Sequence, residues 1–159
     1  MNILIAYFSW KGHTETVAKA VAQKTGGTLV RIEPVTEPGK HMGRMAMRAL
    51  FGSREPIKPV QADMAGVDHL VICTPVWAQN IPPPTRQYLS ELTNCPGKKF
   101  SVLAEMGGSG AEKVARKVRK VLEAKGMQFV ASAETLEKDV EANMVGAIID
   151  EFAQKILAG

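Results

Sequence analysis

The sequence predicts an α/β protein with a doubly wound, parallel sheet and helices on both faces. Five apolar runs, each too short for a helix core, alternate with segments of helical spacing, in the order strand then helix. The runs show no polar alternation, which is typical of strands buried on both faces of a parallel sheet. With 159 residues, of which 45% are hydrophobic, the chain is expected to form one domain over residues 1–159.

The strands and helices can be assigned in order along the chain. Strands are expected at residues 3–8, 28–32, 67–74, 99–105 and 127–133. Helices are expected at residues 14–24, 42–51, 83–92, 111–125 and 140–157. Gly26 and Gly27 end the first helix, and prolines start the third. The last helix has an apolar stripe formed by Met144, Val145, Ile148, Ile149, Phe152 and Ile156.

Composition excludes several classes of protein. Two cysteines, Cys73 and Cys95, are too few for a disulfide framework and lack the spacing of a metal site. Cys73 lies in an apolar run, so we expect it to be buried. No run approaches the roughly 20 apolar residues that cross a membrane, and the N-terminus has no signal-peptide pattern. We therefore expect a cytoplasmic protein with no membrane association.

The net charge of +4, with a pI near 9.1, raises nucleic acid or another anion as a partner. The basic residues lie largely on one helix and one loop without interleaved aromatic residues, so nucleic-acid binding is not expected. A basic segment over residues 40–58 has two interpretations. Either its helix has a solvated basic face, or its side chains form a cationic rim for an anionic cofactor or partner. That rim would consist of Lys40, His41, Arg44, Arg48 and Arg54.

Three chemically distinctive loops follow the first, third and fourth strands. They span Ser9–Thr14, Thr74–Asn80 and Glu105–Gly110. In an open α/β sheet, ligands bind in the crevice at the carboxyl ends of the strands. Because all three loops leave such ends, we expect them to converge on one edge of the sheet.

The first loop has the features of a phosphate site. It supplies hydroxyls at Ser9 and Thr14, a cation at Lys11 and a flexible point at Gly12. The helix that follows begins near His13, so its free N–H groups and its positive dipole end face the loop. An ordinary strand–helix turn with a Ser or Thr N-cap would have the same pattern in this segment.

At these loops, and over essentially the whole chain, the sequence resembles the flavodoxin family, and within it a branch with a Pro-Val-Trp loop. The first loop is similar to the family's FMN phosphate loop, with Lys11 in place of a hydroxyl residue. The matching positions are Ser9, Trp10, Lys11, Gly12, His13 and Thr14. The resemblance implies FMN as the cofactor and a five-stranded sheet in the order 2-1-3-4-5. Lys11 either offsets the phosphate charge directly or points to solvent.

The other two loops resemble the family's flavin-facing turns. The second would form one wall of the isoalloxazine site with Thr74, Pro75, Val76, Trp77, Ala78 and Gln79. An exposed Trp77 suits stacking on a flat ring, and the alternative is a core or surface tryptophan. The third loop would bring backbone groups to the pyrimidine edge of the ring, because its glycines permit close approach. It consists of Glu105, Met106, Gly107, Gly108, Ser109 and Gly110.

Three related classes are disfavoured because their motifs are missing. A phosphoacceptor receiver domain needs carboxylates at the end of its first strand, where this chain has Tyr7, Phe8 and Ser9. A Walker-type NTPase needs a Gly-x4-Gly-Lys-Ser/Thr run, and a usual dinucleotide-binding fold needs Gly-x-Gly-x-x-Gly after its first strand. The sequence has neither run in these places.

Three functions are compatible with these features. In the two redox functions the flavin carries the chemistry, so no side chain is expected to be catalytic. No metal is expected. The first, which we favour because a short domain without a long insertion in its last strand resembles the family's small carriers, is an electron carrier that docks in turn to redox protein partners. The second is an FMN-dependent NAD(P)H:quinone oxidoreductase, which the net charge of +4 favours because carriers of the family are typically acidic. The third, an interaction module with an empty site, is disfavoured by the phosphate loop. The chain would act as a monomer or a homodimer.

Overall fold

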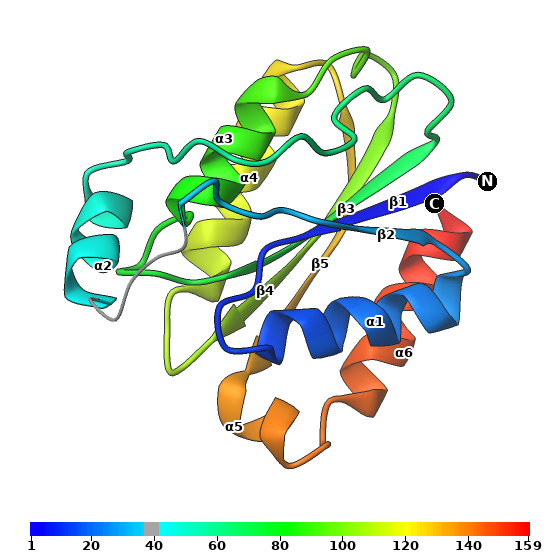
Figure 1. The fold of residues 1–159 in the computed structure, drawn as a ribbon. Helices are drawn as coiled ribbons and strands as arrows, with labels where there is room; N and C mark the ends of the chain where they lie inside the picture. Colours follow the sequence, from blue (N-terminus) through cyan, green and yellow to red (C-terminus); the bar gives the residue numbers. More distant parts are fainter. Residues whose placement is uncertain (37–41) are drawn as a thin grey trace.

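A parallel β-sheet forms the centre of the protein, and its strands follow the order β2-β1-β3-β4-β5 (Figure 1). The computed structural model describes residues 1–36 and 42–159. Over these residues the five strands are β1 Ile3–Tyr7, β2 Thr28–Arg31, β3 His69–Pro75, β4 Lys99–Met106 and β5 Gln128–Leu136. Both the parallel sheet expected from the apolar runs and the strand order implied by the resemblance are confirmed.

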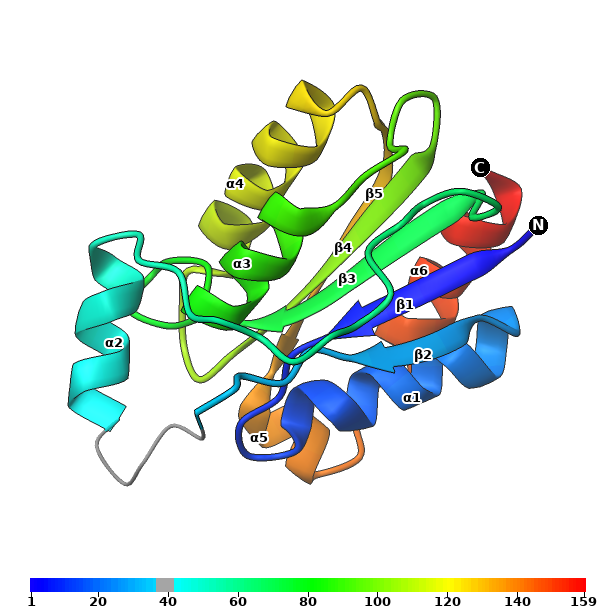
Figure 2. The same ribbon diagram turned by 45° about the horizontal axis from the view of Figure 1, so that its top comes forward.

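Helices cover both faces of this sheet, as Figure 2 shows. On one face lie α3 and α4, and on the other lie α1, α5 and α6. The helices are α1 His13–Thr25, α2 Met42–Leu50, α3 Pro83–Glu91, α4 Ala111–Ala124, α5 Glu137–Glu141 and α6 Gly146–Ala158. The short helix α2 lies beyond α3, near the carboxyl ends of the central strands.

Successive side chains of β1 point to opposite faces of the sheet, and the core accordingly has two layers. Leu4 and Phe8 pack with the side chains under α3 and α4, such as Tyr88. Ile5 and Tyr7 pack with the side chains of α1 and α6 on the opposite face. Since both faces of the strand are buried, a continuous apolar run is required here. Cys73 is fully buried, as expected, and burial raises the pKa of its thiol to about 12.

The single helix expected over residues 140–157 is wrong, because the chain forms α5 and α6 with a break between them. Asn143 has a φ of 55°, in the left-handed region. The Met144 N–H donates to the Asp139 carbonyl over 2.8 Å, and the Asn143 N–H donates to the Val140 carbonyl over 3.1 Å. This pair of bonds is a Schellman motif, in which Asn can replace Gly. Met144 is consequently exposed rather than part of the apolar stripe.

The fifth strand is longer than expected, because it continues to Leu136 instead of ending at Ala133. Its added residues bring Thr135 and the start of α5 to the edge of the sheet where β1, β3 and β4 also end. Among the helices of residues 1–36 and 42–159, none is long and apolar enough to cross a bilayer.

Candidate functional site

The three distinctive loops meet in a hollow of about 200 Å³ at the carboxyl edge of the sheet. The first loop contributes the largest share of the lining, and the second and third loops contribute most of the rest. The lining residues are Ser9, Trp10, Lys11, His13, Thr14, Pro75, Val76, Trp77, Glu105, Gly107 and Glu137. The expected convergence is therefore confirmed.

Some expected site residues lie around the hollow rather than on its lining. These are Gly12, Thr74, Ala78, Gln79, Met106, Gly108, Ser109 and Gly110. Glu137, in contrast, lines the hollow but was not expected there. The strand pattern could have indicated Glu137, because the fifth strand ends at the same edge of the sheet as the others and Glu137 follows it.

The first loop presents the open end of α1 to the hollow. Gly12 precedes the helix with a φ of 96°, a conformation that suits glycine. Its N–H donates to the Ser9 hydroxyl oxygen over 3.1 Å. The first intrahelical bond runs from the Thr16 N–H to the Gly12 carbonyl, over 3.0 Å. The N–H groups of the three residues between them therefore have no acceptor within the helix, and such groups attract an anion.

The hydroxyl of Thr14, expected to face a phosphate, instead has a partner within the protein. It donates to the Oε2 atom of Glu105 over 3.2 Å. Both side chains are buried, and Glu105 reaches this place from the end of β4. Burial raises the pKa of the Glu105 carboxyl group, and the hydrogen bond from Thr14 acts in the opposite direction. The first loop thus has a buried carboxyl group directly beside it.

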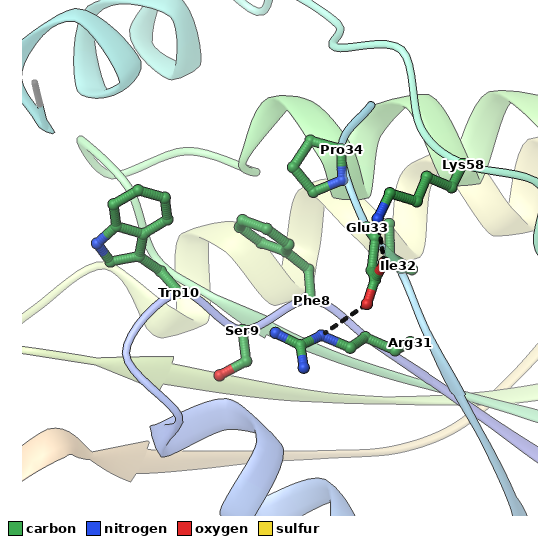
Figure 3. A pocket seen from close by; sticks show the side chains of 8 residues that line it. All are labelled: Phe8, Ser9, Trp10, Arg31, Ile32, Glu33, Pro34 and Lys58. Atoms are coloured by element: carbon green, nitrogen blue, oxygen red, sulfur yellow. Dashed lines mark hydrogen bonds and ion pairs between the residues drawn. The ribbon is translucent and has the colours of Figure 1, made fainter. Parts of the chain in front are cut away.

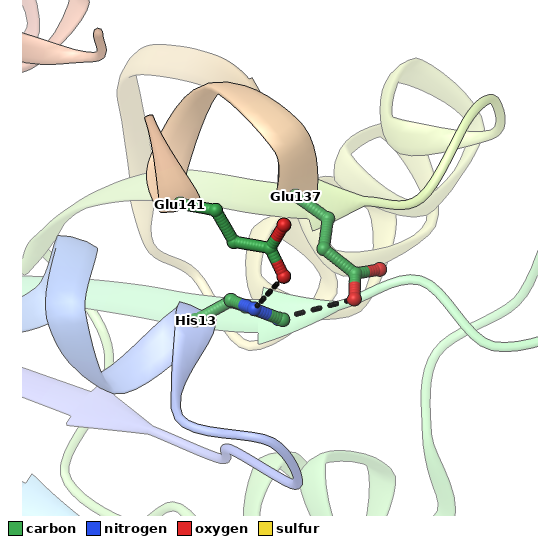
Figure 4. Close-up of side chains that lie close together, drawn as sticks. All are labelled: His13, Glu137 and Glu141. Atoms are coloured by element: carbon green, nitrogen blue, oxygen red, sulfur yellow. Dashed lines mark hydrogen bonds and ion pairs between the residues drawn. The ribbon is translucent and has the colours of Figure 1, made fainter. Parts of the chain in front are cut away.

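His13 links the start of α1 to α5 through two carboxylates (Figure 4). Its Nε2 atom lies 3.0 Å from Glu141 Oε1, and its Nδ1 atom lies 3.5 Å from Glu137 Oε1. Lys11 Nζ lies 3.4 Å from the same Glu137 oxygen. The ligand atoms of His13, Glu137 and Glu141 lie within 4.8 Å of one another, a spacing that could suit a metal ion. Each carboxylate contacts a different ring nitrogen, however, so the imidazole already has a partner on both sides.

The second loop buries its tryptophan, so the expectation of an exposed Trp77 is wrong. Trp77 and Asn80 exchange backbone hydrogen bonds of 3.1 and 2.9 Å, while Ala78 and Gln79 between them have φ angles of 48° and 60°. Two positive φ angles are the pattern of a tight type I′ turn. The turn directs the ring of Trp77 into the core, where it is 7% exposed.

Two aromatic rings hold Trp77 in that position. Its ring meets Phe8 edge-to-face at 5.3 Å between centroids and Trp10 at 6.2 Å. Trp10 is the more exposed of the two tryptophans, and it also lines the hollow. The flat surface nearest to solvent is therefore that of Trp10 rather than Trp77.

The second and third loops contact each other directly. Gln79 Nε2 donates to the Ser109 hydroxyl over 2.8 Å. Gly110 has a φ of 100°, and a Cβ atom built there would lie 3.0 Å from Val76 Cγ1. This close approach requires glycine, because any side chain would both strain the backbone and push the loops apart.

Asn80 fixes the second loop to the helices behind it, a role that sequence reasoning missed. Its Oδ1 atom accepts hydrogen bonds from the Ile81 N–H at 3.0 Å, from Arg86 Nη2 at 3.0 Å and from Lys117 Nζ at 2.9 Å. These donors come from the segment just before α3, from α3 itself and from α4. A single amide oxygen with three donors holds the loop in one position relative to the sheet.

A second cleft of about 440 Å³ adjoins the hollow and shares Ser9 and Trp10 with it (Figure 3). It also includes the end of β2, where Arg31 and Glu33 lie opposite Lys58. Glu33 contacts both cations, with Lys58 Nζ at 2.8 Å and Arg31 Nε at 3.6 Å. Sequence reasoning did not identify this cleft, although the carboxyl end of the second strand lies at the same edge as the three loops.

The cationic rim, one of the two interpretations of the basic segment, can be traced only in part among the described residues. Lys40 and His41 lie outside the described residues. Arg48 pairs with Glu55, so its charge is offset. Arg44 and Arg54 are exposed on and near α2. The apolar side chains of Met47, Leu50 and Phe51 are exposed beside them, so this helix does not have a purely solvated basic face.

Comparison with known proteins gives one family and a set of similar folds. The model of the family described as Flavodoxin matches residues 2–143. No curated protein sequence matches the chain significantly.

Three solved structures are similar over most of their length. A protein of Bacteroides eggerthii provisionally named a flavoprotein has a TM-score of 0.74 and 23% identity, covering 92% of this chain and 97% of its own. A flavoprotein of Lactobacillus acidophilus, solved in complex with FMN, has a TM-score of 0.70 and 17% identity, with coverages of 89% and 97%. Oxidised flavodoxin 2 of Bacillus cereus has a TM-score of 0.66 and 19% identity, with coverages of 99% and 99%. At these identities the likeness concerns the fold.

Proposed function

Since this chain belongs to the flavodoxin family, we propose that it binds FMN and transfers electrons between redox protein partners. The observation that carries the proposal is the open end of α1 within the hollow where the three loops meet. We also assign the chain to the family branch with a Pro-Val-Trp loop, on Pro75, Val76 and Trp77.

The donors at the end of α1 suit a phosphate group. The N–H groups of His13 and Thr14 have no acceptor in the helix, and Ser9 lies beside them with a hydroxyl group. Lys11 is exposed, so its ammonium group is free to turn from Glu137 toward a dianion. Together they supply backbone donors, a hydroxyl and a positive charge, which is the usual donor set of a phosphate site.

The remaining lining would contact the rest of the cofactor. The hollow of about 200 Å³ is smaller than the roughly 300–1,000 Å³ of typical cofactor pockets. FMN would therefore fill the hollow with one end and extend over neighbouring surface. The candidates for these contacts are Trp10, Pro75, Val76, Trp77 and Gly107, with the rest of the second and third loops around them.

Bound FMN supplies the electron-transfer chemistry, and the protein binds it, orients it and limits its contact with water. Trp10 and Trp77 contribute the apolar surface on one side of the hollow. Asn80 and Gly110 keep the second and third loops in place, so these residues act on orientation and not on the reacting atoms. The net charge of +4 favours partner proteins with an acidic docking surface.

A second candidate function, an FMN-dependent NAD(P)H oxidoreductase, is favoured by the cleft of about 440 Å³ that adjoins the hollow. This cleft shares Trp10 with the hollow and has Arg31 and Lys58 on its wall. A nicotinamide nucleotide is flat and anionic, and both properties suit this lining. We rank it second because Glu33 already contacts both cations.

The experiment is the absorbance spectrum of the purified protein with added FMN under anaerobic conditions. Bleaching of the bound flavin by dithionite but not by NADPH is the result expected of a carrier. Rapid bleaching by NADPH alone would favour the oxidoreductase instead. If the protein binds no FMN even when FMN is in excess, both functions are refuted.

A further inference from the structure

A buried carboxyl group lies within the site proposed for the phosphate of FMN. Glu105 is 6% exposed and lines the same hollow as Ser9, Lys11 and Thr14. A phosphate group carries roughly two negative charges at neutral pH. An ionised carboxylate beside it would repel it, and the repulsion is strong where water is largely excluded. The hollow thus combines the donors of an anion site with a group that can itself be an anion.

We propose that Glu105 holds a proton on its carboxyl group when the phosphate of FMN is bound, so that cofactor binding takes up a proton from solvent. This inference rests on the proposed function, because it requires FMN in the hollow. A neutral carboxyl group can donate a hydrogen bond as well as accept one, whereas a carboxylate can only accept. The added proton therefore removes the repulsion and creates a donor in the same place.

In the protein without cofactor, two influences on the pKa of Glu105 act in opposite directions. Burial favours the neutral carboxyl group and raises its pKa. The Thr14 hydroxyl, which donates to Oε2 over 3.2 Å, favours the ionised form. A nearby dianion would add to the first influence. A bound phosphate would therefore shift Glu105 further toward its protonated form.

The other charged groups near Glu105 do not hold its carboxyl group in the ionised form. From the first loop and α1, His13 and Lys11 lower its pKa, while Glu137 of α5 raises it. Lys11 is exposed and paired with Glu137, so it does not provide a buried counter-charge. On β3, the residue in register is the uncharged Pro75.

The neighbouring strand β5 adds an independent observation. Thr135 is in register with Glu105, so the two side chains are on the same face of the sheet. The Thr135 hydroxyl is buried and has no hydrogen-bond partner among the described residues. Buried polar atoms normally have a partner in the protein or in an ordered ligand or water. An unsatisfied hydroxyl on the strand next to Glu105 indicates that polar contacts at this edge are completed by a group outside the described residues, such as a ligand or an ordered water.

The experiment measures the dissociation constant of FMN by flavin fluorescence from about pH 5.5 to about pH 9. This range includes the second ionisation of the phosphate and the ionisation of a carboxyl group whose pKa is raised. It compares the natural protein with Glu105→Gln, which has nearly the same shape and no charge. Both proteins bind the same FMN, and they differ only in the side chain at position 105. The difference between the two pH profiles therefore isolates Glu105.

We expect the dissociation constant of the natural protein to rise with pH more steeply than that of Glu105→Gln, by up to about tenfold per pH unit, since one proton is linked to binding. At the highest pH, Glu105→Gln should bind FMN about tenfold or more tightly than the natural protein. Glu137→Gln is the matched control, because it makes the same change of charge at a partly exposed residue of the same hollow. It should keep the steep profile.

A second measurement needs no variant. Calorimetry of FMN binding in buffers of different ionisation enthalpy gives the number of protons taken up, which should approach one between the pKa values of Glu105 in the free and bound protein. Riboflavin, which lacks the phosphate, should cause no such uptake.

Equal pH profiles for the natural protein and Glu105→Gln would overturn the inference while leaving FMN binding intact. So would weaker binding by Glu105→Gln at every pH, or equal proton uptake with riboflavin. Absence of FMN binding at every pH has a different meaning. It would refute the proposed function, and the proton linkage would fall with it.

Discussion

Gly110 lies so close to Val76 that a Cβ atom on the glycine would be 3.0 Å from the Cγ1 atom of the valine. This approach joins the loop after β3 to the loop after β4, and the hydrogen bond from Gln79 to Ser109 lies beside it. The two loops thus form one unit at the edge of the hollow.

Replacing Gly110 with alanine should destabilise the protein by about 1–3 kcal/mol, because the residue has a φ of 100° and no space for a side chain. Urea unfolding measures this free energy. Gly108→Ala is the control, since a Cβ atom there meets nothing within 4 Å, and it should change stability by less than about 0.5 kcal/mol. Equal effects at the two positions would show that the loops do not need close contact.

Removal of the Thr14 hydroxyl should weaken FMN binding. In Thr14→Ala the free energy of FMN binding should become less favourable by about 1–3 kcal/mol, because a buried hydroxyl donor at the proposed phosphate site is lost. Thr16→Ala is the control on the same helix. The Thr16 hydroxyl is exposed and donates to the Gly12 carbonyl. An unchanged dissociation constant in Thr14→Ala would exclude the Thr14 hydroxyl from the phosphate site.

The two tryptophans should differ in their effect on stability. Trp77→Ala should lower the free energy of unfolding by about 3–5 kcal/mol, because it removes a buried ring that contacts Phe8 and Trp10. Trp10→Ala should cost less, since Trp10 is only partly buried. Thermal or urea unfolding of both variants provides the measurement. A larger loss in Trp10→Ala would contradict the core position of Trp77.

His69 should make the protein sensitive to acid. It is fully buried at the start of β3, and its Nε2 atom lies 2.9 Å from the Ser101 hydroxyl. Burial, together with the charge of Lys99, lowers its pKa from 6.5 to about 4. Between these values the unfolded chain binds a proton that the folded protein does not. The contribution of His69 to the free energy of unfolding is therefore fully present above about pH 6.5. It is lost as the pH drops toward 4, by about 3 kcal/mol in total.

Urea unfolding at a series of pH values tests this dependence. His69→Gln should lose the part of the acid sensitivity that lies between pH 4 and 6.5, the two pKa values given for His69. His13→Gln is the control, because His13 is partly exposed and lines the hollow at the carboxyl edge of the sheet, whereas His69 begins β3. If the natural protein and His69→Gln have parallel pH profiles, the histidine is not held neutral by the fold.

The sequence by itself determined the order of strands and helices, the parallel sheet and the edge at which the three loops meet. These properties follow from local patterns. An apolar run without alternation is buried on both faces, and loops that leave carboxyl ends of parallel strands share an edge. The break at Asn143 also had a local signal, since Asn is one of the residues that adopt the left-handed conformation.

Only the tertiary structure decided which side chains are partners at that edge. Thr14 and Glu105 are 91 residues apart, and their contact depends on the register of β4 and the position of α1. Trp77 is buried because a two-residue turn directs its ring toward Phe8, whereas the sequence shows only a tryptophan in a loop. Periodicity reports which face of an element is apolar, but contacts between distant residues depend on how the elements pack. For that reason the first loop and Glu105 could each be singled out from the sequence, and the contact between Thr14 and Glu105 could not.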